Sequence, residues 1–189
     1  MNPYATRTHQ DMLDVLKNPE ANGPVVHYHM IRGGSEKRNI TVWEPGTIGD
    51  EYIKAYGHYH VDGIPETYQI VQGEGILLLQ KRIVRDGKTV NDELESCTAI
   101  FVKAGDKIDI PGDEGHTMIN TGNIWLVTID DSPIAGTTPE EISKPSHADY
   151  APIKTMHGFG YYVVKNSENK PEFVKNSNYK VIPELKIKN

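Results

Sequence analysis

The sequence predicts an all-β protein, a single jelly-roll barrel with a short N-terminal helix. From position 24 onward, short runs rich in Val, Ile, Thr and Tyr recur about every ten residues. Gly, Pro, Asn and Asp turns separate these runs, and only one segment has helical periodicity. Many short strands at even spacing are typical of an antiparallel barrel or sandwich. The 189 residues suffice for one packed domain, so we expect residues 1–189 to form one.

The helix is expected over residues 8–17. Its apolar positions, among them Met12, Val15 and Leu16, fall on one side, and Pro19 lies just beyond its end. One amphipathic helix before the first strand is compatible with an all-β class.

The barrel is expected over residues 24–175. Its strands are predicted near 24–31, 39–43, 51–56, 58–61, 66–72, 75–83, 97–103, 106–110, 116–120, 123–130, 158–165 and 171–175. Residues 131–150 have no strand pattern and are expected to form a long loop or a short helix. The Lys- and Asn-rich tail after Lys175 is expected to be loose.

Composition excludes several classes of function. The chain has 26 acidic and 20 basic residues, a net charge of −6, which argues against non-specific nucleic-acid binding. Its one cysteine, Cys97, excludes an internal disulfide and a Cys-rich zinc site. The opening segment has no apolar signal core, and the longest apolar stretches are too short to span a bilayer. We therefore expect a cytoplasmic protein with neither nucleic acid nor a membrane as its partner.

A first motif that carries chemistry is Gly57-His58-Tyr59-His60, followed by Glu66. Alternate residues of a strand share a face, so His58 and His60 point the same way about 6.5–7 Å apart. That separation suits two imidazoles that converge on one cation. The five residues before Glu66 include Gly and Pro, which allow the chain to fold back alongside.

A second motif follows about fifty residues later and contains Gly105, Pro111, His116 and Asn120. His116 supplies a third imidazole. Three histidines and Glu66 offer only nitrogen and oxygen donors, which suit a divalent metal such as Fe²⁺, Mn²⁺, Ni²⁺, Co²⁺ or Zn²⁺.

The two motifs, in this order and at this separation, resemble those of the cupins, which implies a cupin barrel with a metal site. The chain departs from the commonest cupin pattern in two places. The gap between His60 and Glu66 is longer, and Asp113 stands where a glycine is usual, with Gly112 one place early.

A narrower resemblance covers residues 20–165. The stretch 41–60 contains T-x-x-x-P-G-x-x-G-x-E and runs directly into the His pair, as in the cupin-type phosphoglucose isomerases of archaea and some bacteria. The wide gap before Glu66, the turn at 73–75 and the late segment 147–150 are similar to that family too. The resemblance implies an isomerase of glycolysis and gluconeogenesis that interconverts glucose 6-phosphate and fructose 6-phosphate and binds one divalent metal, Fe²⁺ first among the candidates.

The chemistry of that reaction assigns roles to residues. Glu66 is the only carboxylate close to the expected metal, so it is the candidate base as well as a candidate ligand beside His58, His60 and His116. The hydrogen moves between C1 and C2 either as a proton through a cis-enediol or as a hydride, and the sequence leaves both routes open. Tyr68 follows Glu66 by two positions, so its ring is expected to line the same cavity.

The resemblance also implies how the sugar phosphate is held. Thr41 and Gly57 map onto phosphate-binding positions of the family, and His147 corresponds to a histidine near the substrate. A third phosphate position, a threonine in the family, is Ala55 here, which leaves the exact sugar phosphate open. The resemblance further implies a homodimer.

Other interpretations stay open. The alternatives are another sugar-phosphate isomerase or epimerase, a cupin Fe dioxygenase, and a non-catalytic sugar- or metal-sensing cupin. A second His-x-His pair, His27 and His29, has no glutamate at useful spacing, and a structural or cavity-lining role is favoured for it.

Overall fold

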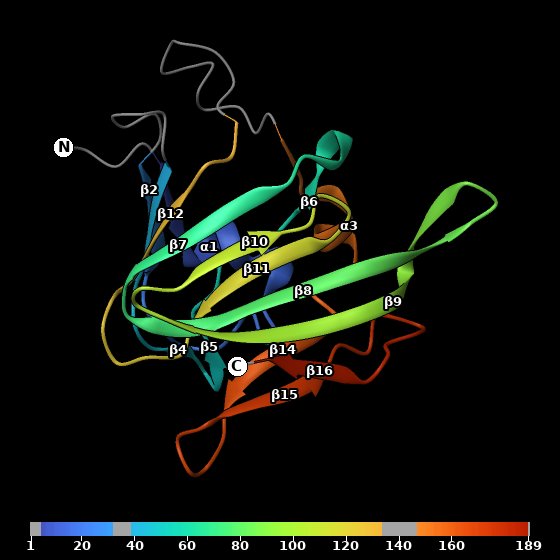
Figure 1. Ribbon diagram of the computed structural model, residues 1–189. Coiled ribbons are helices and arrows are strands. Elements are labelled where there is room, and N and C mark those ends of the chain that lie inside the picture. The colour runs from blue at the N-terminus through green and yellow to red at the C-terminus, as the bar shows by residue number, and fades with distance from the viewer. Residues whose placement is uncertain (1–4, 32–38, 134–146, 189) are drawn as a thin grey trace.

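The computed structural model describes residues 5–31, 39–133 and 147–188 (Figure 1). The largest sheet has six strands, in the order β1 (Ala5–Thr8), β2 (Val26–Ile31), β3 (Asn39–Trp43), β12 (Leu126–Asp130), β7 (Glu66–Gln72) and β10 (Lys107–Ile110). A second sheet has four strands, in the order β11 (Gly115–Asn120), β8 (Glu74–Arg85), β9 (Lys88–Lys103) and β16 (Leu185–Lys188).

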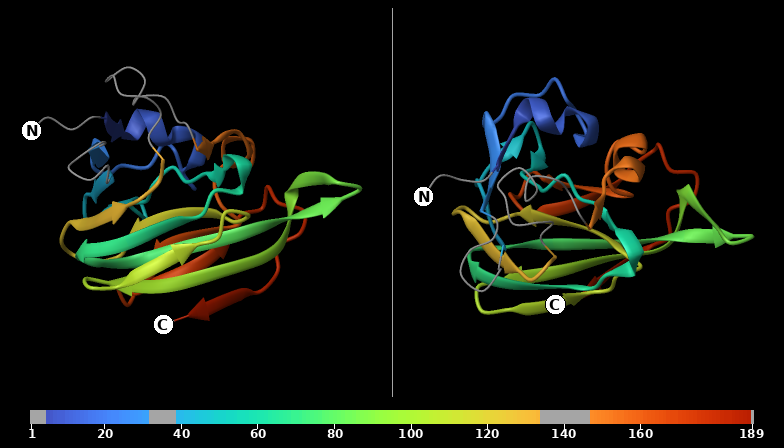
Figure 2. Two further views of the ribbon diagram at one scale, coloured as in Figure 1. Left: turned by 45° about the horizontal axis from the view of Figure 1, so that its top comes forward. Right: turned by 90° about the horizontal axis from the view of Figure 1, so that it is seen from above.

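Two smaller sheets complete the β structure of the described residues. One has the order β15 (Pro171–Lys175), β14 (Tyr161–Lys165), β5 (Glu51–Tyr52) and β4 (Thr47–Ile48), and the other pairs β13 (Ala148–Asp149) with β6 (Tyr59–His60). The helical segments are short: α1 (His9–Met12), η1 (Leu13–Val15), η3 (Val61–Gly63) and α3 (Ala151–Thr155). Figure 2 shows α1 and α3 on the same side of the long β8–β9 hairpin. The all-β prediction is confirmed, although the strands divide among separate sheets rather than closing into one hydrogen-bonded barrel.

Burial alternates along the strands of the large sheet, as the sequence pattern predicts. In β3, Asn39, Thr41 and Trp43 are buried while the residues between them are half-buried. Strands β8 and β11 are buried over consecutive residues instead, so both of their faces are covered. Both large sheets contribute to one apolar cluster, which reaches from Met12 to Tyr179. None of the helices in the described residues is long and apolar enough to cross a membrane.

The N-terminal helix is shorter than the predicted 8–17. Thr8 caps α1 with a capping box that involves Asp11, and the chain changes to a 3₁₀ turn that ends at Val15. The helix stops there because its next polar groups bind elsewhere in the fold. The Val15 carbonyl accepts a hydrogen bond from Lys54 Nζ at 2.6 Å, and the backbone N–H of Lys17 donates to Glu51 Oε2 at 2.7 Å.

The expectation of a loose C-terminal tail is wrong for the described residues. Strand β16 pairs in parallel with β9, and Leu185 lies opposite Cys97. Tyr179 is buried, and its hydroxyl donates to the Gly158 carbonyl at 2.9 Å. The sequence does not predict β16, because its Lys residues break the apolar pattern. This segment forms a strand by pairing with β9. Most of the loop or helix predicted at 131–150 falls on residues 134–146, outside the described part of the chain.

The unusual position of Gly112 has a steric reason. A Cβ at this position would lie 1.9 Å from the carbonyl oxygen of Gly63, in the turn that follows the His pair. We expect Gly112→Ala to lower the free energy of unfolding by about 1–3 kcal/mol, measured by denaturant titration. Asp113→Ala is the matched control, because Asp113 is an exposed neighbour. Equal stability of Gly112→Ala and Asp113→Ala would show that the fold does not need the close approach of residue 112 to the Gly63 carbonyl.

Candidate metal centre

Backbone pairing brings the two motifs together. His58 and His116 form an antiparallel bridge in which the N–H of His58 donates to the His116 carbonyl at 3.2 Å, and the reverse bond is 3.0 Å long. His60 lies at the end of β6, and Glu66 begins β7 after the η3 turn. The alternation predicted for the His pair is confirmed, because Tyr59 points away into the core while the rings of its neighbours lie 5.3 Å apart.

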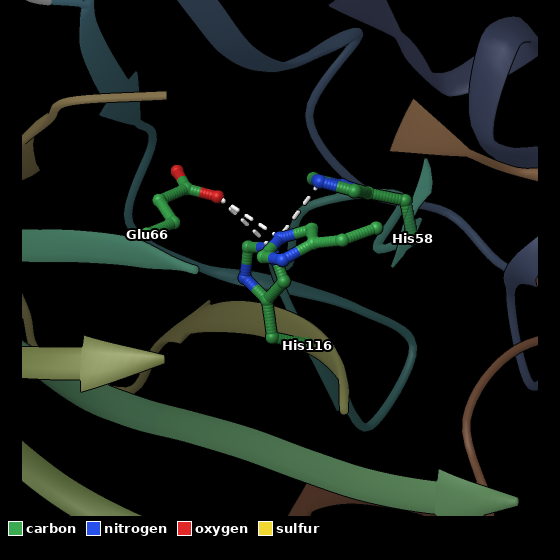
Figure 3. Close-up of side chains that lie close together, drawn as sticks. His58, Glu66 and His116 are labelled. Atoms are coloured by element: carbon green, nitrogen blue, oxygen red, sulfur yellow. Dashed lines mark hydrogen bonds and ion pairs between the residues drawn. The ribbon is translucent and has the colours of Figure 1, made fainter. Parts of the chain in front are cut away.

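Four potential ligand atoms converge, one each from His58, His60, Glu66 and His116, and all lie within 4.8 Å of one another. The Nε2 atom of His116 is 3.2 Å from that of His58 and 3.0 Å from that of His60. Glu66 Oε2 lies 3.2 Å from His60 Nε2 and 3.4 Å from His116 Nε2. Figure 3 shows the side chains of His58, Glu66 and His116 pointing toward one another.

The electrostatics of the cluster prepare it for a cation. Burial, followed by the charge of His116, holds the pKa of His58 well below its usual value, so His58 is neutral and offers a lone pair. Burial alone would raise the pKa of Glu66, but the contacts of its carboxylate with the His116 and His60 rings and the charge of His116 outweigh burial, and the net pKa lies well below the usual range. Glu66 is therefore ionised at neutral pH.

The donor set fits a divalent metal. A neutral imidazole has one N–H, so three Nε2 atoms at such short separations cannot all pair with one another. Glu66 Oε2 is buried without a hydrogen-bond partner, which is costly for a carboxylate. A cation at the centre would satisfy all four atoms, and nitrogen and oxygen donors suit Fe²⁺, Mn²⁺, Ni²⁺, Co²⁺ or Zn²⁺.

A small cavity of about 40 Å³ opens beside this cluster. Three of the four residues expected to contact substrate line it, namely Thr41, Gly57 and Tyr68, whereas His147 is not among its lining residues. Ala55, His58 and His116 line it as well. The Tyr68 ring lies 5.5 Å from that of His116, edge-on. A larger cavity of about 690 Å³ shares no lining residue with this one, and none of the four converging residues lines it.

His147 also reaches the cluster. Its ring centroid lies 5.3 Å from that of His58 and 6.0 Å from that of His60, and the residue is buried. The strand pair β6–β13 places it there, because Ala148 pairs with His60 and the N–H of Val61 donates to the His147 carbonyl.

Gly57 has a structural requirement of its own. Its φ is +78°, and a Cβ would lie 2.3 Å from the Phe159 ring. Glycine is needed here whatever the residue binds. The neighbouring Ala55 carbonyl accepts a hydrogen bond from the Thr117 hydroxyl at 2.9 Å, so a threonine on β11 packs against this segment from the opposite strand.

The second His-x-His pair does not join the cluster. His27 is fully buried, with its ring 5.6 Å from that of His9. His29 lies 3.1 Å from the Thr6 hydroxyl and stacks on Trp125. Neither lines the cavity, so the structural interpretation favoured for this pair agrees with where the two side chains lie.

Two tyrosines that line the cavity were missed as site residues. Tyr28, on β2, is buried at the wall, and the Tyr150 ring lies 5.5 Å from those of His58 and Tyr56. Both lie within residues 20–165, which resemble the isomerase family, and Tyr150 belongs to the similar late segment 147–150. That resemblance was a usable signal, but tyrosines at apolar strand positions are also common in cores.

Comparison with known proteins decides the family. The model described as glucose-6-phosphate isomerase (GPI) matches residues 25–181. The chain belongs to this family. The all-β cupin fold expected from the motifs agrees with this membership. No curated protein sequence matches the chain.

Solved structures with some similarity include cupin proteins. A predicted oxalate decarboxylase from Thermotoga maritima is 22% identical, with 55% of this chain and 76% of that chain covered and a TM-score of 0.36. Oxalate decarboxylase from Bacillus subtilis is 15% identical, with 69% and 26% covered and a TM-score of 0.39. A Drosophila melanogaster CENP-C domain is 17% identical, with 55% and 63% covered and a TM-score of 0.37. These scores are too low to carry any argument about activity.

Proposed function

We propose that this member of the GPI family is a metal-dependent aldose–ketose isomerase that interconverts glucose 6-phosphate and fructose 6-phosphate. The observation that carries the proposal is the convergence of three imidazoles and one carboxylate beside a cavity. His58 and His116 of this cluster line the cavity together with Thr41, Gly57 and Tyr68. Family membership over residues 25–181 supports the same reaction. The alternatives of a dioxygenase and a sensing module have no comparable support.

In this proposal His58, His60, Glu66 and His116 hold one divalent metal, with Fe²⁺ the first candidate. When bound, the metal stabilises the negative charge that develops on the O1 and O2 oxygens of the open-chain sugar.

Glu66 is the proposed proton carrier. Its ionised carboxylate takes the proton from C2 of the aldose while O1 gains a proton, which gives the enediol. The carboxylic acid then returns its proton to C1 while O2 loses its hydroxyl proton, so that one proton has moved from C2 to C1 and one from O2 to O1. The reverse reaction takes the proton from C1 of the ketose. Deuterium from solvent D₂O should therefore appear in the product, whereas a direct hydride shift would leave the product unlabelled.

The remaining contacts are proposed from the cavity. The Thr41 hydroxyl and the Gly57 N–H are candidate donors to the phosphate, while the Tyr68 ring and His147 flank the sugar. A volume of about 40 Å³ is below the roughly 300 Å³ of a typical ligand pocket. Side chains at the wall must therefore shift when substrate enters.

The decisive experiment is a coupled assay of fructose 6-phosphate conversion before and after chelation, with single metals added back. We expect chelation to abolish turnover and one divalent metal, Fe²⁺ first, to restore it, because only a cation neutralises the enediol charge at this site. Zero turnover with every metal would reject the proposed reaction. Full turnover after complete metal removal would reject the metal's catalytic role.

The family resemblance also supports a cytoplasmic homodimer. Size-exclusion chromatography with light scattering tests the dimer, and a mass of 21.2 kDa in solution would contradict it.

A further inference from the structure

Arg7 places a cation next to two wall residues of the cavity, from outside the residues that the family model matches. It lies on β1, directly opposite Tyr28 in the antiparallel pair β1–β2. Its half-buried guanidinium lies close to the hydroxyls of Tyr28 and Tyr150. Tyr28 and Tyr150 are both wall residues of the cavity beside the metal centre. The N-terminal strand therefore delivers a positive charge behind this wall.

The Tyr28 hydroxyl connects Arg7 to the expected phosphate-binding segment. It accepts a hydrogen bond from the backbone N–H of Tyr56 at 3.3 Å. Tyr56 stands between Ala55 and Gly57, which are both at the cavity. Tyr28, the cross-strand neighbour of Arg7, thus also contacts the backbone of residues 55–57.

The charge of Arg7 is not neutralised where it lies. Within the described residues no carboxylate oxygen is within 4.0 Å of it, and its Nε is buried without a hydrogen-bond partner. Two acidic groups lie nearby: Asp11 is tied to Thr8 in the capping box, and Asp14 interacts with the Tyr56 hydroxyl. Burial raises the pKa of both Tyr28 and Tyr56 to about 12, so these phenols are neutral. None of the residues that line the cavity is a lysine or an arginine.

A phosphate monoester needs more than neutral donors in a chain with a net charge of −6. The Thr41 hydroxyl and the Gly57 N–H carry no charge, and Ala55 lacks the hydroxyl that the family has at this position. Guanidinium presents a planar fork of N–H donors that matches phosphate oxygens. A half-buried guanidinium with a free Nε–H is suited to such an anion.

We propose that Arg7 binds the phosphate group of the substrate together with Thr41, Gly57 and the Tyr28 hydroxyl. This inference rests on the proposed sugar-phosphate isomerase function and names the residue that confers preference for a phosphorylated sugar. Arg7 acts in binding, remote from the carbons that react.

The test is calorimetric binding of glucitol 6-phosphate, which has no carbonyl group and cannot be turned over, to the metal-loaded protein. Arg7→Met should raise its Kd about 10- to 100-fold, since hydrogen bonds between charged groups carry an effect of this size. Arg7→Lys keeps the charge but lacks the planar fork of donors, so its Kd should lie between those of the wild type and Arg7→Met. In the coupled assay, Arg7→Met should raise KM by a similar factor with kcat nearly unchanged.

Arg85→Met is the matched control, because it removes the same charge from an exposed arginine that pairs with Glu93 on the β8–β9 hairpin. Its Kd should change less than about twofold. Thermal unfolding of each variant, and the Arg7→Lys protein in particular, verifies that a weaker ligand affinity does not reflect unfolding. Unphosphorylated glucitol gives the second comparison, since its affinity should not depend on Arg7.

The outcomes separate the two proposals. An unchanged Kd for glucitol 6-phosphate in Arg7→Met, or equal losses for the phosphorylated and unphosphorylated ligands, overturns the role of Arg7 while turnover in the wild type still supports the isomerase. Arg7-dependent phosphate affinity without turnover supports Arg7 and rejects the isomerase. A wild-type protein that neither binds the ligand nor turns over substrate overturns both.

Discussion

Replacing Glu66 with glutamine is expected to lower kcat for fructose 6-phosphate about 10²- to 10⁴-fold while the protein keeps its metal. Glutamine preserves the shape of the side chain and an oxygen donor, but it cannot accept the sugar proton. The imidazoles of His58, His60 and His116 still converge without the carboxylate, because the bridge between His58 and His116 is formed by backbone. Turnover is measured in the coupled assay, and metal content is measured by elemental analysis.

Glu74→Gln is the control for this change, since Glu74 is an exposed carboxylate on β8. Its kcat and metal content should equal those of the wild type. His116→Ala should lose metal and activity together, because it removes both a central ligand and the contact to Glu66. If Glu66→Gln loses its metal together with its activity, Glu66 acts as a metal ligand and not as the base. Unchanged kcat would favour the hydride route.

The second large effect concerns stability. Lys54→Met should lower the free energy of unfolding by about 3–5 kcal/mol, the usual cost of leaving one partner of a buried ion pair uncompensated. Lys54 Nζ lies 2.5 Å from Glu51 Oε1 and 2.6 Å from the Val15 carbonyl, and both side chains are almost fully buried. The Tyr162 ring covers the ammonium at 4.9 Å. Without Lys54, the Glu51 carboxylate is buried without its cationic partner, and the Val15 carbonyl at the end of η1 loses its hydrogen bond.

Lys17→Met is the matched comparison. Lys17 Nζ pairs with Asp50 Oδ2 at 2.7 Å, but both side chains are partly exposed, and such pairs contribute about 0–1 kcal/mol. Denaturant unfolding of both variants gives the difference. A double variant, Lys54→Met with Glu51→Met, should recover most of the loss, because no buried charge remains. Equal stabilities of the two single variants would show that the buried pair has no special weight.

The metal centre could be predicted from the sequence because its constraints are local. The alternation of a strand places His58 and His60 on one face, and the Gly- and Pro-containing turn returns Glu66 to them. The second motif added His116, and the family resemblance added Thr41 and His147; all three lie at the cluster or at its cavity. How Thr41 and His147 act on substrate stays a prediction.

Several features of the fold could not be predicted in this way. Strand β16 has a weak pattern of its own and becomes a strand by pairing with β9, far away in the sequence. The helix at 8–17 ends early at Val15 because Lys54 takes its terminal carbonyl. Glu51 belongs to the motif of the isomerase family that precedes the His pair. Its side chain pairs with Lys54 and not with the metal centre.

The class of the fold, most strand positions and the donors of the metal centre follow from hydrophobic period, turn residues and motif spacing, which can be read along the chain. The surroundings of these donors depend on how distant strands pair. Pairing between β1 and β2 carries Arg7 to Tyr28, and the Tyr28 hydroxyl reaches the backbone of Tyr56. Such contacts join residues separated by about twenty to thirty positions, and no local pattern specifies them, because burial and charge at a site depend on all the strands that pack there.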